Sequence, residues 1–246
     1  MKYLFTVAYD GRAYHGYQVQ KGHVTVQEKL QDAIEKLYGK RYPIVGCSRT
    51  DSGVHARDFK AAIFVDDDAP AIPVDRLPLA LNIFLPEDIS VKKADIVSDT
   101  FHPRYDVRLK EYEYLILNSK VRDPFLFGRA YLYPLPLDEK MMNRAAEHLK
   151  GTHDFSAFMT SGSDVSDCVR TIYDCTVTRN GSLVSIRISG SGFLYNMVRI
   201  ITGTLIEVSA GRFSPEDIDS ILASRDRSRA GFTAPACGLY LNRVVY

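Results

Sequence analysis

The sequence lacks several features that mark particular classes of protein. Its 31 lysine and arginine residues are balanced by 30 aspartate and glutamate residues, so the net charge of +1 does not indicate a nucleic-acid-binding protein. Any such site must be a local basic patch. The four cysteines are scattered, without a CxxC pair or a His/Cys cluster at zinc spacing. A Gly-rich phosphate loop and a dinucleotide fingerprint are also missing, which disfavours nucleotide-dependent enzymes.

Long apolar runs are missing as well. No run reaches the length that crosses a bilayer, and the apolar start of the chain ends at Asp10 without a signal-peptide cleavage pattern. Scattered cysteines are typical of reduced thiols in a cytosolic protein. We therefore expect a cytoplasmic protein. With 246 residues, 46% of them hydrophobic and 25% charged, the chain suffices for one large domain or two of ordinary size.

The hydrophobic pattern predicts strands interleaved with helices along the whole chain. Thr25 begins a capping-box signature with Glu28, and Gly39 stands where the following helix ends. Asn180-Gly181 is a strong hairpin signal. Strands are predicted at 2–9, 43–47, 59–65, 89–97, 112–118, 171–179, 182–188 and 238–246, and helices at 26–37, 73–85, 138–150, 193–209 and from Ser214-Pro215.

The order of these elements predicts an α+β fold with two similar halves. We place the boundary in the stretch 101–110, giving an N-terminal half at 1–104 and a C-terminal half at 105–246. Two sheets side by side would leave a cleft between them, which is a common place for a site.

The segment Arg49-Thr50-Asp51-Ser52-Gly53-Val54-His55-Ala56 combines an arginine, a carboxylate, a glycine and an imidazole just after a predicted strand. Catalytic groups concentrate on loops held by a rigid scaffold. Aspartates in loops also commonly accept backbone hydrogen bonds in turns. From these residues alone, Asp51 is either a catalyst or a turn residue.

Six segments, in order along nearly the whole chain, resemble the tRNA pseudouridine synthase A family. The sequence departs from the family's pattern at three positions: Ser48 and Ser52 replace two other small residues, and Tyr17 stands where tryptophan is common. The segments are Tyr9-Asp10-Gly11 with Tyr14-His15-Gly16-Tyr17-Gln18, Thr25-Val26-Gln27-Glu28, the Arg49–Ala56 loop, Phe101-His102-Pro103-Arg104 with Lys110-Glu111-Tyr112-Glu113-Tyr114, Phe193-Leu194-Tyr195-Asn196-Met197-Val198-Arg199 with Ile201-Thr202-Gly203, and Ala234-Pro235-Ala236-Cys237-Gly238-Leu239-Tyr240-Leu241.

The resemblance implies two ferredoxin-like halves whose sheets join around a central RNA-binding cleft. It implies an isomerase that converts uridines to pseudouridine at about positions 38 to 40 of the tRNA anticodon stem-loop, reading RNA shape more than base identity. It also implies a homodimer. The reaction adds and removes nothing, so neither a cofactor nor a metal is expected.

The resemblance also assigns roles to individual residues. Asp51 is the essential catalytic carboxylate, and Arg199 is its guanidinium partner. Tyr112 would stack on the flipped uracil and could relay a proton. Arg49 and His55 would bind substrate or orient the loop. The alternative role for His55 is that of a general base.

Purely structural or non-catalytic alternatives exist for these roles. Tyr112 or Tyr114 could simply pack in the core, and Arg199 could be a solvated helix residue. A non-catalytic tRNA-binding module or RNA folding helper is the second functional hypothesis. A third hypothesis, a hydrolase, requires a metal cluster or a nucleophile elbow. The sequence contains neither pattern, which disfavours this hypothesis.

Overall fold

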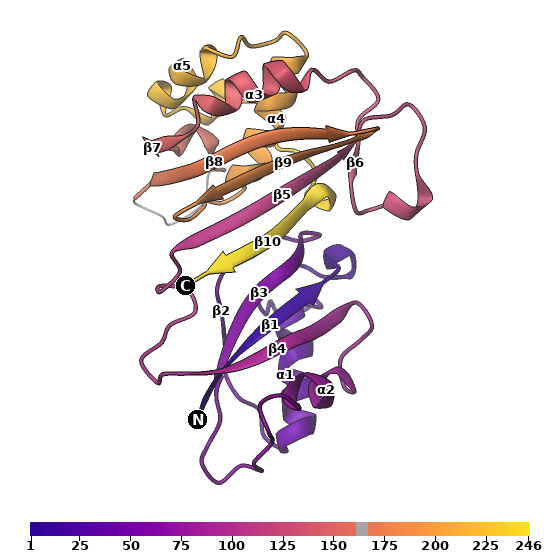
Figure 1. Cartoon of the computed structure of the whole chain (residues 1–246), viewed down its shortest axis with the longest axis vertical. Helices are drawn as coiled ribbons and strands as arrows, with labels where there is room; N and C mark the ends of the chain where they lie inside the picture. The colour runs from indigo at the N-terminus through magenta and orange to yellow at the C-terminus, as the bar shows by residue number, and fades with distance from the viewer. Residues whose placement is uncertain (161–166) are drawn as a thin grey trace. The chain divides into compact units, whose positions relative to one another are not determined.

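The computed structural model describes residues 1–160 and 167–246 (Figure 1). The chain forms two compact units. Unit 1 comprises Met1–Arg108 and Tyr240–Tyr246, and unit 2 comprises Leu109–Leu239. The last strand thus groups with the N-terminal unit. The boundary at residue 104 between an N-terminal and a C-terminal half stays a prediction. Within the described residues, no helix is long and apolar enough to cross a bilayer.

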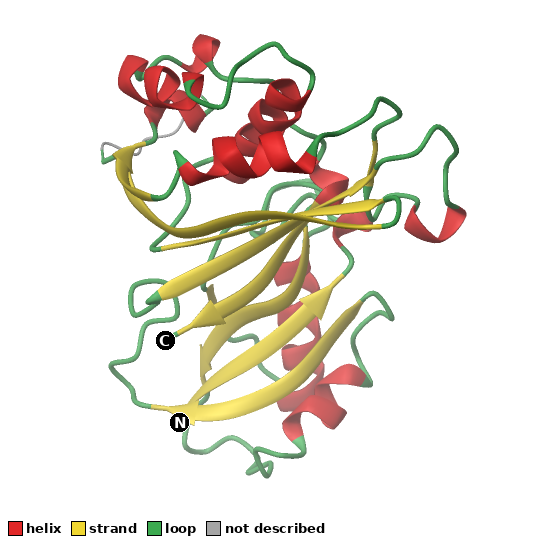
Figure 2. Ribbon diagram, turned by 45° about the horizontal axis from the view of Figure 1, so that its top comes forward, coloured by secondary structure: helices red, strands yellow, loops and turns green. Residues whose placement is uncertain are grey.

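Unit 1 has the split βαβ arrangement of a ferredoxin-like fold. Its strands lie in the order β4-β1-β3, antiparallel throughout, with β2 antiparallel beside β3. Both helices pack on one face of the strands (Figure 2). The elements are β1 (Lys2–Tyr9), α1 (Val26–Tyr38), β2 (Ile44–Gly46), β3 (His55–Phe64), α2 (Leu77–Asn82), β4 (Ile89–Val97) and β10 (Leu239–Val245).

Helix α1 follows the predicted signals closely. The Thr25 hydroxyl accepts a hydrogen bond from the Glu28 amide, and Gly39 ends the helix at φ 72°. Val26, Leu30 and Ile34 are buried, as the helical spacing predicts. By contrast, α2 is much shorter than the predicted 73–85, because it begins only at Leu77.

The outer edge of β3 is shared by two strands. The β2 residues Ile44 to Gly46 pair with Ile63 to Ala61, and β10 runs parallel to the other end of β3. There Tyr240 pairs with His55 and Leu241 with Ala56. The prediction that β3 begins at residue 59 was therefore wrong, because pairing with β10 extends the strand back to His55.

Unit 2 is built around an antiparallel sheet in the order β5-β9-β8-β7. Helices α3, α4 and α5 lie together on one face of this sheet (Figure 2). The α+β class predicted from the sequence is confirmed. The elements are β5 (Leu109–Leu117), β6 (Tyr131–Leu132), α3 (Glu139–Glu147), β7 (Gly151–Asp154), β8 (Val169–Asn180), β9 (Leu183–Gly190), α4 (Met197–Ser209) and α5 (Asp217–Ser224).

Two helix starts in unit 2 differ from their predictions. Helix α4 begins at Met197 rather than Phe193, because Asn196 adopts a left-handed backbone conformation with φ 60°. Ser214 does not cap α5; instead the Asp217 carboxylate accepts a hydrogen bond from the Ser214 amide at 2.7 Å. The hairpin at Asn180-Gly181 is confirmed, with Gly181 at φ 58°.

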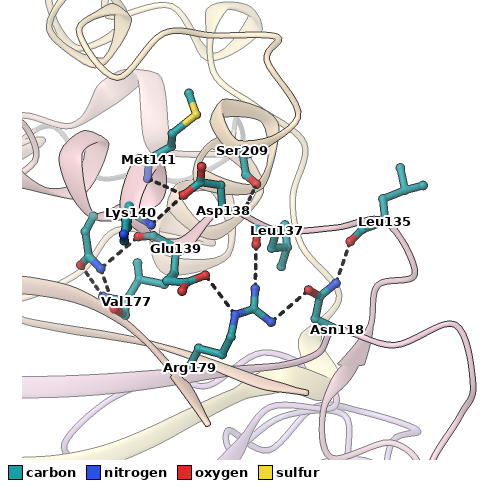
Figure 3. A network of polar contacts seen from close by, with 11 residues as sticks. Asn118, Leu135, Leu137, Asp138, Glu139, Lys140, Met141, Val177, Arg179 and Ser209 are labelled. Carbon is teal, nitrogen blue, oxygen red and sulfur yellow. Dashed lines mark hydrogen bonds and ion pairs between the residues drawn. The ribbon is translucent and has the colours of Figure 1, made fainter. Parts of the chain in front are cut away.

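A polar network anchors α3 and the chain entering it (Figure 3). The Arg179 guanidinium donates to Glu139, to the Leu137 carbonyl and to Asn118. Asn118 in turn donates to the Leu135 carbonyl at 2.6 Å. These bonds tie both ends of the excursion 119–136 to the sheet of unit 2.

The core of unit 1 contains two buried hydroxyls without a hydrogen-bond partner among the described residues, those of Tyr17 and Tyr38. The Tyr17 ring stacks on Phe59 at 4.1 Å between centroids, and only 2% of the residue is exposed. An unsatisfied buried hydroxyl costs about 1–3 kcal/mol. The Tyr17 ring therefore stabilises the core by packing, whereas its buried hydroxyl oxygen destabilises it.

We predict that Tyr17→Phe raises the free energy of unfolding by about 1 kcal/mol, because it removes the unsatisfied oxygen and keeps the ring. Urea denaturation measures the change. The matched control is Tyr9→Phe, which loses a buried 2.8 Å hydrogen bond to Thr50 and should be less stable. A Tyr17→Phe protein less stable than the wild type would contradict the prediction.

Candidate active site

The Asp51 loop is held by the segment that follows β1. The Tyr17 amide donates to the Thr50 carbonyl at 3.2 Å, and the Gly53 amide donates to the Tyr14 carbonyl at 3.2 Å. The Tyr9 hydroxyl also shares a 2.8 Å hydrogen bond with the Thr50 hydroxyl. These contacts bind the loop to rigid parts of unit 1 on both sides of Asp51.

Two glycines allow this close approach. A Cβ atom at Gly11 would lie 2.0 Å from the Val54 carbonyl oxygen, and one at Gly16 would lie 2.3 Å from that of Thr50. Gly16 also has a φ of 79°, which side chains rarely adopt. The two backbone segments can therefore approach this closely only because Gly11 and Gly16 have no side chains.

Asp51 itself is half-buried and begins a turn. The Val54 amide donates to the Asp51 carbonyl at 3.1 Å, and Gly53 takes a positive φ of 78° within that turn. The neighbouring Arg49 is exposed on the same loop. Asp51 therefore lies on a defined turn. This position agrees with both roles considered for it, catalyst and turn residue.

His55 lies at the start of β3, and only 2% of it is exposed. Its Nδ1 atom accepts a hydrogen bond from the Gly11 amide at 3.0 Å, and its ring stacks on Tyr240 at 4.6 Å between centroids. These contacts fit the orienting role expected for His55 better than a general-base role, since Nδ1 is already engaged.

The Asp10 carboxylate lies beside His55, with Oδ1 3.2 Å from Nδ1. Partial burial raises the pKa of Asp10, but hydrogen bonds from Arg12 and the charge of Arg12 outweigh it and hold that pKa below its usual value. A charged Asp10 therefore lies next to the start of β3.

Tyr112 and Tyr114 of unit 2 occupy different surroundings. Tyr114 is fully buried, and its hydroxyl donates to the Pro235 carbonyl at 2.7 Å. Burial raises the pKa of Tyr114, while nearby Arg199 lowers it only in part. Tyr112 is 7% exposed and packs edge-to-face with Phe193 at 5.1 Å. Tyr114 therefore has a complete structural role, which leaves Tyr112 as the better candidate.

Arg199 lies in the first turn of α4 and is half-buried. Its Nε donates to the Ala234 carbonyl at 2.7 Å, and its Nη1 donates to the Asn196 side-chain oxygen at 2.7 Å. The Ala234 amide returns a hydrogen bond to the Arg199 carbonyl at 3.0 Å. The guanidinium is therefore oriented by unit 2 and is not an ordinary solvated helix residue.

The part of the chain that the structure describes contains no group of three or more His, Cys, Asp or Glu side chains arranged to hold a metal ion. Arg49, Asp51 and His55 share one loop of unit 1, and Tyr112 and Arg199 belong to unit 2.

Sequence reasoning overlooked Asn196, Gly11 and Gly16 as residues that shape these sites. Asparagine tolerates the left-handed backbone conformation better than most residues, but before a helix it is equally a signal for an N-cap with an extended backbone. The glycines stand within the first recognised segment, but their partners 34 or more residues away could not be read from spacing.

Taken together, the fold and these residues define an α+β protein with a carboxylate on a clamped loop in one unit and an oriented guanidinium in the other. Residues 6–106 and 145–246 match the tRNA pseudouridine synthase family model. The chain belongs to the tRNA pseudouridine synthase family.

Curated relatives support this assignment over the full length. The chain is 47% identical over 243 residues to the tRNA pseudouridine synthase A of Thermoanaerobacter sp. (strain X514), covering 99% of this chain and 98% of that protein. It is 46% identical to the tRNA pseudouridine synthase A of Bacillus subtilis (strain 168), covering 100% and 99%.

Among solved structures, a chain of a Cbf5-Nop10-Gar1 complex is 12% identical with a TM-score of 0.35, covering 97% of this chain and 57% of that chain. A likeness this low adds nothing to the argument.

We predict that Gly16→Ala destabilises the protein by about 1–3 kcal/mol more than Gly22→Ala. Both glycines have a φ of 79°, so the backbone strain is matched. Only the Gly16 substitution clashes with another segment, since a Cβ at Gly22 would meet nothing within 4 Å. Urea unfolding of both variants measures the difference, and equal losses would show that the close approach to Thr50 carries no strain.

Proposed function

We propose that this protein converts uridine to pseudouridine in tRNA and that Asp51 is its catalytic carboxylate. The reaction breaks the bond between C1′ and N1 and forms one between C1′ and C5. C5 loses a proton and N1 gains one, so composition is unchanged. The observation that supports Asp51 most directly is its place on a loop clamped by Gly11, Gly16 and Tyr9. Catalysis needs groups held in place before the substrate arrives.

Arg199, Tyr112, Arg49 and His55 complete the proposed site. Arg199 supplies the cation that pairs with the catalytic carboxylate. Tyr112 stacks on the base once it is flipped out of its stem, and Arg49 contacts the RNA backbone. His55 orients the loop through Gly11, which agrees with its hydrogen bond and burial.

The proposed substrate is the anticodon stem-loop, with uridines at about positions 38 to 40 modified, as the resemblance implies. We place the activity in the cytoplasm, where the four scattered cysteines remain reduced thiols.

We predict that Asp51→Asn lowers the rate of pseudouridine formation at least about a thousandfold while leaving tRNA binding in place. Unmodified tRNA is incubated with enzyme, and pseudouridine is mapped by carbodiimide chemistry. Asp75→Asn removes an exposed carboxylate of the same unit and should leave the map unchanged. If the wild type binds tRNA but forms no pseudouridine, the protein is a non-catalytic binding module.

We also propose that the protein acts as a homodimer. The excursion 119–136 of unit 2 projects from the sheet, yet its ends are tied by Asn118 and Arg179 (Figure 3). Apolar side chains lie open on this ordered surface: Val121 is 73% exposed, Phe125 84% and Leu135 58%. Exposed apolar patches of this kind mark protein interfaces.

If this surface joins two copies, Phe125→Asp should shift the protein from dimer to monomer, because an interface then has to bury a charge. Sedimentation equilibrium at micromolar concentration measures the change. The control is Ile83→Asp, which alters a side chain of unit 1 that is 78% exposed and should leave the dimer intact. A wild type that is monomeric at this concentration would rule out the homodimer.

A further inference from the structure

The residue before α4 is built to hold the guanidinium of Arg199. Asn196 has a φ of 60° and a ψ of 6°, and it is one of two residues other than glycine with positive φ among residues 1–160 and 167–246. For most side chains this conformation costs about 1–2 kcal/mol, and asparagine tolerates it better than most. Such strain persists only where the surrounding structure requires it.

Both ends of the Asn196 amide are engaged. Its oxygen accepts from Arg199 Nη1 at 2.7 Å, and its nitrogen donates to the Thr160 hydroxyl at 2.9 Å. Because a guanidinium can only donate, the orientation of the amide is unambiguous. The Thr160 amide also donates to the Tyr195 carbonyl at 3.2 Å, which ties the same two segments a second time.

Two of the acceptors that hold Arg199 belong to unit 2, and neither carries a charge. The Asn196 amide oxygen and the Ala234 carbonyl oxygen, each 2.7 Å away, are both neutral. Neutral acceptors fix the plane of a guanidinium without cancelling its charge. A carboxylate in the place of the Asn196 amide would form an ion pair instead.

We propose that Asn196 is a positioning residue for the pseudouridine-forming reaction: its left-handed backbone and neutral amide orient Arg199 while preserving the positive charge for the catalytic carboxylate. This inference rests on the proposed function, and in particular on Arg199 as the partner of Asp51. The amide acts through Arg199 and has no contact with substrate in this assignment.

Two variants separate orientation from charge. Asn196→Gly keeps the left-handed conformation without strain and deletes the amide. Asn196→Asp keeps an acceptor oxygen of nearly the same shape, and aspartate also tolerates this conformation, but it adds a negative charge beside Arg199. A purely structural role predicts that Asn196→Asp changes the melting temperature, because the donor to Thr160 is lost, and leaves kcat unchanged.

The matched control is Asn143→Asp in the same unit. The Asn143 side chain joins α3 to β8 through two hydrogen bonds with the Val177 backbone, at 2.6 and 2.8 Å. Losing its donors should lower the melting temperature and leave kcat unchanged. This control shows how far instability alone affects the assay.

The experiment measures kcat, the tRNA Kd, the melting temperature and the pH dependence of kcat for these variants. We expect kcat to fall about tenfold to hundredfold in both Asn196 variants, while Kd stays within about twofold. The acid limb of the kcat profile should move to higher pH, since a carboxylate with a less effective cation ionises less readily. Wild-type kcat in Asn196→Asp, or equal losses in kcat and in binding, would overturn the assignment.

Wild-type and Asp51→Asn proteins are assayed in parallel. If the wild type forms pseudouridine and Asp51→Asn does not, the proposed function stands and the Asn196 variants alone decide this inference. If the wild type forms none, the proposed function fails and the inference fails with it.

Discussion

The backbone of residues 11–16 lies against the backbone of residues 50–54, and much of unit 1 is arranged to make that contact possible. Two positions, Gly11 and Gly16, have no room for a side chain because carbonyl oxygens of Val54 and Thr50 occupy the space. The Gly11 amide donates to His55, and the Tyr9 hydroxyl shares a hydrogen bond with the Thr50 hydroxyl, so that neighbouring residues hold the same two segments together. The Asp51 loop gains its shape from this contact together with its own turn at Gly53.

Unit 2 orders its polar group by a different device. Arg199 is held by one side-chain oxygen and one backbone oxygen, both supplied by unit 2 itself. A helix start that bends through a left-handed asparagine sets the direction of the side chain. Each unit thus prepares its own charged group, a carboxylate in one and a guanidinium in the other, by local means.

The regular elements were the most predictable part of the fold. Thr25 and Gly39 set the ends of α1, and Asn180-Gly181 set the hairpin, because these signals act over a few residues. The start of β3 at His55 could not be predicted, since it depends on pairing with Tyr240 far along the chain. The start of α4 was missed because its apolar pattern continues through Phe193 and Leu194, while the backbone turns at Asn196. Asp51 remained ambiguous until its place in an ordered set of segments was considered.

The shared edge of β3 has a consequence for the order in which the protein can be built during translation. One end of that edge, Ala61 to Ile63, pairs with β2, which leaves the ribosome before β3. The other end, His55 and Ala56, pairs with β10, which emerges long afterwards. The Arg57 side chain, for example, donates to Asn242, 185 positions later. While unit 2 is being synthesised, the backbone groups beside His55 and Ala56 are open to other strands. Without its last strand, unit 1 therefore has an exposed stretch of the β3 edge, and the shortness of that stretch limits mispairing.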